Sequence, residues 1–141
     1  MLTASLRIIE TMSQGVNVLI HCSDGWDRTS QVSSLVQLIV DPYFRTLDGF
    51  AVMVEKEWLH AGYNFKTRHA MGESGTDKQG PIFLMFLDAV HQLYVQNMEA
   101  FEFNLQYLCD MAYNVYSGVY GTFLCDSELV FSIIPNRFQL F

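Results

Sequence analysis

The sequence is organised around nine residues, His21-Cys22-Ser23-Asp24-Gly25-Trp26-Asp27-Arg28-Thr29. A short apolar run with β-branched residues, 16–20, precedes them, and a second apolar run at helical spacing, 32–40, follows. This pattern predicts a loop between a β-strand and the N-terminus of a helix. Because free backbone N–H groups and the positive end of the helix dipole meet there, such a loop is a ready anion-binding site.

Cys22 and Arg28 bracket this loop, with five residues between them. A cysteine surrounded by N–H groups at the start of a helix has a lowered pKa and is a thiolate at neutral pH. The guanidinium of Arg28 fits two oxygens of a phosphate group, Gly25 permits a tight turn, and the hydroxyl of Thr29 can donate to the sulfur. The sequence therefore predicts a phosphate-binding loop in which Cys22 is the nucleophile of a phosphocysteine mechanism.

Four further residues of the loop have predicted roles in catalysis or substrate binding. We expect Asp27 to be the general acid that protonates the leaving alkoxide, and Asp24 to orient a leaving group with several hydroxyls. Trp26 is expected to form a wall of the pocket, and Ser23 to contact the substrate. Simpler interpretations stay open: either carboxylate can be a helix N-cap, and the tryptophan can be a core residue. Likewise, the cysteine can be a buried structural thiol and the arginine a surface cation.

Length and composition exclude several classes of protein. The 141 residues form at most one domain, and half of them are apolar, which is enough for a sizeable core. The net charge of −7 argues against nucleic acid as a partner. Three cysteines, Cys22, Cys109 and Cys125, lack metal-ligand spacing, so we expect no metal, no cofactor and a reducing, cytosolic setting. The latter two are predicted to be core thiols.

Most of the remaining chain has the spacing of helices. The pattern predicts helices near 3–14, 32–40, 47–60, 82–94 and 101–116, with the second ending at Asp41-Pro42. A glycine-rich stretch, 61–80, predicts a long loop that carries much of the positive charge. Within it, Arg68 could meet a second phosphate of the substrate or be a solvated loop cation.

The predicted strand at 16–20 has no predicted neighbour. A lone strand cannot satisfy its own backbone groups, and in an α/β fold it would be the central strand of a parallel sheet. Either strands are hidden among the predicted helices, or the sheet partners lie outside this chain. In the second case, the isolated chain should be poorly stable and should expose apolar surface.

Several segments together resemble the C-terminal part of the catalytic domain of myotubularins, the phosphoinositide 3-phosphatases. The similar segments are VLIHCSDGWDRTSQ, DPYFRT, VEKEWL, PIFLMFLDAVHQL, FEFN and GTFLCDSE. The resemblance is strongest over residues 16–128 and implies that residues 1–141 are a partial myotubularin-type phosphatase domain. The implied fold class is α/β, the fold of cysteine-dependent C-x5-R phosphatases, here as a mostly helical fragment with one central strand leading into the loop.

The resemblance also implies a function and site residues. It implies removal of the 3-phosphate from phosphatidylinositol 3-phosphate and from the 3,5-bisphosphate, with Cys22 as nucleophile, Arg28 as phosphate ligand and Asp27 as acid. Active members often carry two basic residues, four apart, near the 5-phosphate. Arg68 matches the second of these, whereas Asn64 stands at the first.

Partners and location follow from the same resemblance. The implied partners are a phosphoinositide in a membrane surface and another myotubularin in a homo- or heterodimer, and the implied location is cytoplasmic, peripheral on endosomal membranes. Two other functions stay open: a non-catalytic remnant that binds phosphoinositide or a partner, and a protein tyrosine or dual-specificity phosphatase.

Overall fold

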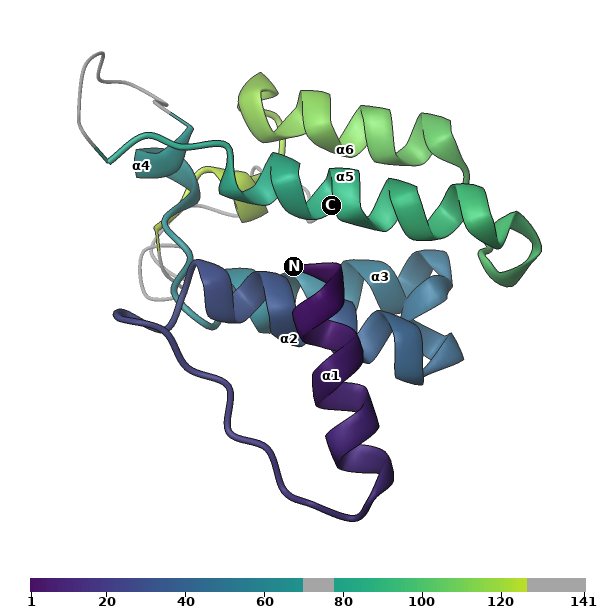
Figure 1. Ribbon diagram of the computed structural model, residues 1–141. Coiled ribbons are helices and arrows are strands. Elements are labelled where there is room, and N and C mark those ends of the chain that lie inside the picture. The colour runs from purple at the N-terminus through teal and green to yellow at the C-terminus, as the bar shows by residue number, and fades with distance from the viewer. Residues whose placement is uncertain (70–77, 127–141) are drawn as a thin grey trace.

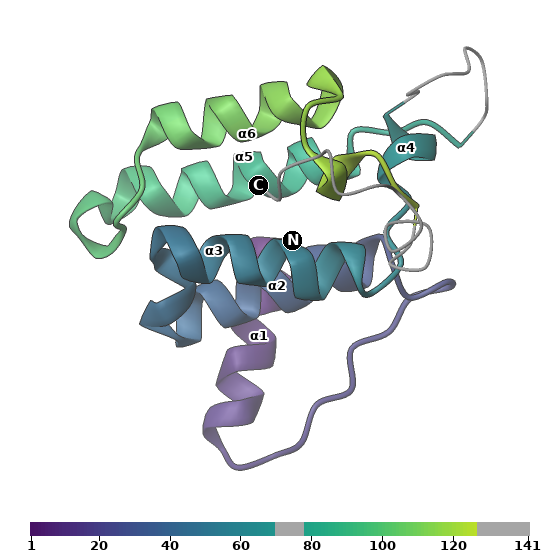
Figure 2. The ribbon, with the colours of Figure 1, turned by 180° about the vertical axis from the view of Figure 1, so that it is seen from behind.

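The computed structural model describes residues 1–69 and 78–126, and its helices lie in two layers (Figure 1). Helices α2, Arg28–Val40, and α3, Leu47–Val54, form one layer. Helices α5, Ile82–Gln96, and α6, Leu105–Ser117, run side by side in the other, as both ribbon views show (Figure 2). The helices predicted after the loop are therefore confirmed, although the last begins at Leu105 rather than near residue 101.

The first helix and the short helices complete the fold. Helix α1, Leu2–Ser13, packs against α2 and projects from the body of the protein, and α4, Phe65–Arg68, is a single turn at the side (Figure 1). A π-helical turn, η2, Glu55–Leu59, continues α3 directly, so the helix predicted over 47–60 is confirmed. In the described part of the chain, two 3-10 turns connect the longer helices, η1, Pro42–Arg45, and η3, Met98–Ala100, and a third, η4, Gly121–Phe123, follows α6.

Local sequence explains where these helices begin and end. The Thr46 side chain caps α3 by accepting from the Gly49 N–H at 3.0 Å, and Asn104 caps α6 in the same way. Gly118, with φ of +69°, ends α6 in the left-handed conformation that glycine adopts readily. Gly49 is also required by space, since a Cβ there would lie 1.9 Å from the Tyr43 carbonyl oxygen.

The core lies between the two layers and is dominated by aromatic rings. Trp58 is fully buried at its centre, with edge-on contacts to Tyr63 and Phe83 at centroid distances of 4.9 and 4.8 Å. Its indole N–H donates to the hydroxyl of Ser34 on α2 at 3.0 Å, so the buried polar group is satisfied. This core fixes α2, and therefore the start of α2, against the rest of the protein.

The predicted strand is not formed. Residues 16–22 are extended but make no backbone hydrogen bond to any described residue, and the described part of the chain contains no β-strand. A strand needs a neighbour to pair its N–H and C=O groups, and these residues have none in the described structure. The mostly helical character of the chain is confirmed, whereas the central strand is absent from the described residues and stays a prediction.

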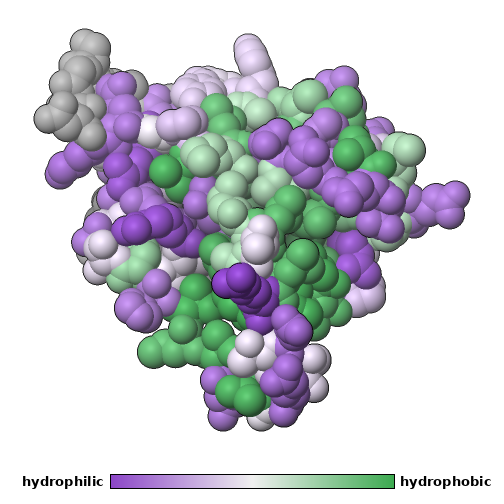
Figure 3. Space-filling view, viewed as in Figure 1, coloured by the Kyte–Doolittle hydropathy of each residue, from purple (hydrophilic) through white to green (hydrophobic). Residues whose placement is uncertain are grey.

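The unpaired segment leaves apolar side chains at the surface. Leu19 is 86% exposed, and Val16 and Val18 are also exposed. On the preceding helix α1, the side chains of Leu6 and Met12 are exposed as well. Figure 3 shows apolar surface on the lower part of this face, where α1 and the following segment lie. The expectation of exposed apolar surface is therefore confirmed for the described residues.

The cysteines outside the loop differ from each other. Cys125 is fully buried, as predicted, and burial raises the pKa of its thiol. Cys109 is exposed on α6, so its assignment to the core was wrong. The apolar stripe of α6 passes through Leu108, Met111 and Val115, and Cys109 lies one residue off that stripe.

Candidate active site

The nine-residue stretch forms the turn that leads into α2. Asp27 is the N-cap residue of this helix, and Gly25 has a φ of +92°, a conformation that side chains other than glycine rarely adopt. The Ser30 hydroxyl donates to the Trp26 carbonyl at 2.8 Å, and the Gln31 N–H donates to the Asp27 carbonyl at 3.2 Å. The predicted placement of the loop at a helix N-terminus is therefore confirmed.

Cys22 lies at the start of this turn with its sulfur directed back toward the helix. The Gly25 N–H donates to Sγ at 3.2 Å. The pKa of the Cys22 thiol is lowered from 9.0 to about 6, above all by the side chain of Thr29. Burial opposes this effect, and the backbone N–H groups of Gly25, Asp24 and Thr29 lower the pKa further. In the static geometry the buried Thr29 hydroxyl makes no hydrogen bond to any described residue, the sulfur included, so its effect on the thiol requires the hydroxyl to turn toward Sγ. Cys22 is therefore largely a thiolate at neutral pH.

Arg28 reaches back across the turn as the first residue of α2. Its Nη2 donates to the Ser23 hydroxyl at 3.1 Å, and the side chain is exposed. The structure thus brings the arginine to the residue next to the cysteine. An exposed guanidinium whose one partner among the described residues is neutral keeps most of its donors available to an incoming anion.

Asp27 does not cap α2 with its side chain. No capping bond is formed, and both carboxylate oxygens instead accept hydrogen bonds from Arg68: Nε donates to Oδ1 at 3.2 Å, and Nη2 contacts Oδ2. The two side chains are 17% and 20% exposed, so the ion pair is largely shielded from water. The structure therefore joins the predicted acid to the predicted second phosphate ligand, 41 residues away in sequence.

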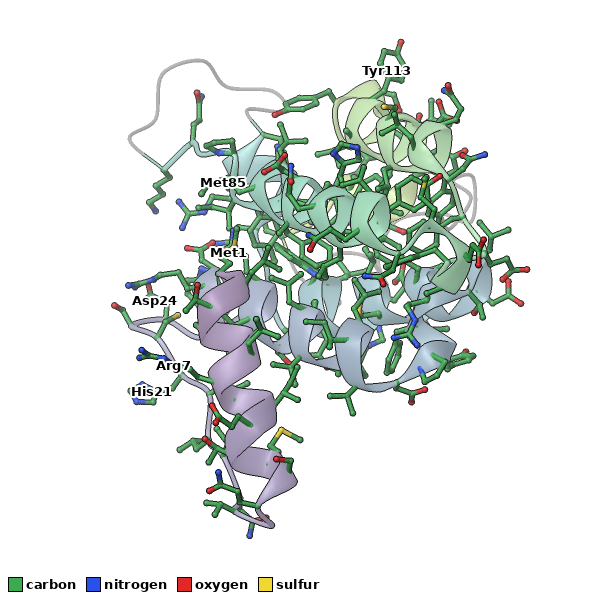
Figure 4. All side chains as sticks on the ribbon, turned by 45° about the vertical axis from the view of Figure 1, so that its right-hand side comes forward. Met1, Arg7, His21, Asp24, Met85 and Tyr113 are labelled. Carbon is green, nitrogen blue, oxygen red and sulfur yellow. The ribbon has the colours of Figure 1, made fainter. Side chains whose placement is uncertain are left out.

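Asp24 and Trp26 occupy different surroundings. Asp24 is exposed, and Figure 4 shows its side chain at the outer edge of the loop, with His21 directed away from the helices on the extended segment. The indole of Trp26 is partly buried, and its buried N–H has no acceptor among the described residues. Among the described residues, neither the Asp24 side chain nor the Trp26 side chain forms a hydrogen bond with Cys22. The predicted substrate contacts of Ser23, Asp24 and Trp26 stay predictions.

Sequence reasoning missed the contacts that fix Arg68. Its Nη1 donates to the Lys78 carbonyl at 2.5 Å, and its own carbonyl accepts from the Gly80 N–H at 3.1 Å. Helix α4 is also held by Asp126, whose carboxylate accepts from the N–H and the hydroxyl of Thr67 at 3.0 and 2.7 Å. The signal that could have pointed to Asp126 is its place within GTFLCDSE, one of the segments that resemble myotubularins.

The described ranges contain neither a metal-binding cluster nor a membrane-spanning helix. Among residues 1–69 and 78–126, no group of three histidine, cysteine or acidic residues is placed to hold a metal ion. In the same ranges, no helix has the length and apolar character needed to cross a bilayer.

Comparison with known proteins identifies the family. The family model described as the myotubularin-like phosphatase domain matches residues 1–130. Over 130 residues, the chain is 45% identical to phosphatidylinositol-3,5-bisphosphate 3-phosphatase MTMR6 of Caenorhabditis elegans, covering 88% of this chain and 19% of that protein. Two further phosphatidylinositol-3,5-bisphosphate 3-phosphatases, MTMR2 of Bos taurus and MTMR4 of Homo sapiens, are also 45% identical to it. Each match covers 90% of this chain, together with 20% of the bovine protein and 11% of the human one. The chain thus spans a fifth of these relatives or less, and it belongs to the myotubularin-like phosphatase domain family.

Proposed function

We propose that this chain carries the catalytic loop of a phosphoinositide 3-phosphatase that acts on phosphatidylinositol 3-phosphate and on the 3,5-bisphosphate. The observation that carries the proposal is the Cys22 thiol, whose pKa of about 6 makes it a nucleophile at the N-terminus of α2. The names of the relatives, phosphatidylinositol-3,5-bisphosphate 3-phosphatases, support this choice of substrate.

The proposed reaction proceeds through two displacements at phosphorus. In the first, Sγ of Cys22 forms a bond to phosphorus while the bond to the 3-oxygen of inositol breaks, and an acid gives its proton to the departing oxygen. In the second, water forms a bond to phosphorus while the sulfur–phosphorus bond breaks, and the proton of the water returns to the former acid. Inorganic phosphate leaves and the thiolate is restored, so no metal or cofactor is required.

Each loop residue has a share in this scheme. Arg28 and the free N–H groups of the first turn of α2 hold the oxygens of the transferring phosphoryl group. Thr29 stabilises the sulfur anion, which must form again when water attacks. Asp27 is the proposed acid and Asp24 the proposed contact to ring hydroxyls. The extended segment 16–20 would be the central strand of an α/β phosphatase fold when neighbouring strands pair with it.

The substrate is a lipid, and the proposed place of action follows from that. We propose that the enzyme works at a membrane surface, on the cytoplasmic side of endosomal membranes, and that it pairs with itself or with another myotubularin.

A second function is favoured by one observation. The extended segment 16–22 has no backbone hydrogen-bond partner among the described residues, which favours a chain that binds phosphoinositide or a partner without turnover. A third alternative, a phosphatase acting on phosphotyrosine, uses the same thiolate with a different leaving group. The two acidic residues of the loop favour a polyhydroxyl leaving group over a phenol.

One assay separates these functions. Phosphate release is measured with short-chain phosphatidylinositol 3-phosphate, its 3,5-bisphosphate and a phosphotyrosine peptide, for the chain and for Cys22→Ser. Release from the lipids that is lost in Cys22→Ser is the expected result. Equal release in both proteins would overturn the proposal. Lipid binding by both without release would establish the non-catalytic function, and a preference for the peptide would establish the third.

A further inference from the structure

The contact between Asp27 and Arg68 directs the predicted acid at a guanidinium instead of at a leaving group. Both carboxylate oxygens accept hydrogen bonds from one guanidinium, through Nε and Nη2. A general acid must carry its proton on one of these oxygens and direct it at the leaving oxygen. While Arg68 holds both oxygens, the carboxyl group is turned toward the guanidinium and cannot turn toward a leaving oxygen. For Asp27 to act, at least one of the two hydrogen bonds must break.

Arg68 is held in a way that favours this pairing. Its third nitrogen, Nη1, donates to the Lys78 carbonyl at 2.5 Å, and helix α4 is fixed by the two bonds between Thr67 and Asp126. The guanidinium therefore presents its Nε–Nη2 edge to Asp27 from a preorganised position. This edge is the part of arginine that binds carboxylate or phosphate through two parallel hydrogen bonds.

A phosphate group is the natural competitor for this edge. A phosphate carries up to two negative charges and a carboxylate one, and both accept the same two hydrogen bonds from arginine. Two phosphates on one inositol ring are held close together by the ring. If the 3-phosphate binds the loop at Cys22, the second phosphate approaches the residues at the rim of that loop, where Arg68 contacts Asp27.

We propose that Arg68 is a positioning residue that holds Asp27 in an ion pair and releases it when a second phosphate of the substrate takes over its Nε–Nη2 edge. This inference rests on the proposed function and adds a mechanism of substrate selection. A bisphosphate frees the acid that its own hydrolysis needs, whereas a monophosphate leaves the acid paired. Selectivity then resides in kcat as well as in KM.

The kinetic test compares the two lipids in three proteins: the chain, Arg68→Gln and Lys66→Gln. Lys66 is the matched control because it is an exposed cation two residues away on the same helix. We expect the chain and Lys66→Gln to have a higher kcat for the bisphosphate than for the monophosphate. In Arg68→Gln, the kcat for the monophosphate should rise and the two values should agree within about twofold, while KM for the bisphosphate increases.

The same variant distinguishes this role from simpler ones. If Arg68 only binds the second phosphate, Arg68→Gln raises KM for the bisphosphate and leaves kcat for the monophosphate unchanged. If it only supports the fold, both kcat values fall together with the melting temperature. Either result overturns the proposal. Asp27→Asn should lower kcat for both lipids by roughly 10²-fold or more, and should lower it far less for an aryl phosphate whose phenolate leaves without a proton.

A second measurement is independent of turnover. In the Cys22→Ser chain, the Arg68 Nε–H signal is followed by NMR during titration with inositol 1,3-bisphosphate and inositol 1,3,5-trisphosphate. We expect the Arg68 signal and the Asp27 carboxyl carbon to change only with the trisphosphate. Equal responses to both compounds, or a response of the loop amides without Arg68, would overturn the proposal. If the lipids are not hydrolysed but this titration succeeds, the proposed function fails, and only the exchange of Arg68 from Asp27 to the second phosphate stands.

Discussion

Replacing Thr29 should make Cys22 less acidic, because the Thr29 hydroxyl contributes most to the low pKa of this thiol. With a pKa of about 6, about nine-tenths of Cys22 is thiolate at pH 7, compared with about one-hundredth for a thiol with the ordinary value of 9.0. A hydrogen bond to a charged group contributes about 1.5–3 kcal/mol, and each pH unit corresponds to about 1.4 kcal/mol. Thr29→Val should therefore raise the titration midpoint of Cys22 by about one to two pH units.

The assay is the rate of alkylation by iodoacetamide as a function of pH, with peptide mapping to separate Cys22 from the exposed Cys109 and the buried Cys125. For the unchanged chain, the rate should rise with pH and reach its plateau near neutrality, with a midpoint of about 6. Thr11→Val is the matched control, since the Thr11 hydroxyl donates only to the Arg7 carbonyl within α1.

Two results would refute the reasoning. A midpoint for the unchanged chain in the range of ordinary thiols would mean that the loop does not stabilise the thiolate. A low midpoint that Thr29→Val leaves unchanged would mean that the backbone N–H groups alone lower the pKa. In that case, Gly25→Ala, which strains a residue at φ of +92°, should disturb the midpoint instead.

Three further predictions concern stability, each measured by urea unfolding. Burial lowers the pKa of His69 to about 4. As the pH falls, the unfolded chain therefore takes up a proton on this histidine before the folded chain does. The free energy of unfolding should fall by about 2 kcal/mol between pH 7.5 and pH 5 for this reason. His69→Phe should remove that part of the pH dependence, and an unchanged dependence would contradict the burial argument. Ser34→Ala leaves the buried indole N–H of Trp58 without its acceptor and should cost about 1–3 kcal/mol, whereas a loss near zero would show that the bond contributes nothing. Leu19→Asp should change stability by less than about 0.5 kcal/mol, because the leucine is 86% exposed; a large loss would mean that residues 16–20 are packed.

Helices could be predicted from the sequence because their backbone hydrogen bonds are local. The stop at Asp41-Pro42 and the apolar spacing of α5 each act within a few residues, and both appear in the structure. The strand at 16–20 could not be decided in this way, since its hydrogen bonds depend on residues far away in sequence. The same limit applies to Cys109, whose exposure depends on what α6 packs against.

The loop was predictable in its position and in the state of its cysteine, but the partner of Asp27 was not. Residues at fixed spacing around Cys22 determine which N–H groups and hydroxyls can reach the sulfur. The Asp27–Arg68 pair joins positions that are 41 residues apart. Arg68 lies on the four-residue helix α4, which is held in place by a hydrogen bond between Thr67 and Asp126, 59 residues further along the chain. No local pattern encodes such a contact.

The unpaired segment and the acidic thiol together indicate which side of the loop controls the chemistry. Residues 16–22 have no backbone partner in the described structure, yet the Cys22 thiol keeps a pKa of about 6. Every group that lowers this pKa, namely Thr29 and the N–H groups of Asp24, Gly25 and Thr29, lies C-terminal to the cysteine. Because α2 is fixed through its contacts with the core, this half of the site is preorganised without the strand. Pairing of residues 16–20 with neighbouring strands would then stabilise the site and orient the Cys22 side chain, but it would not be needed to ionise the thiol.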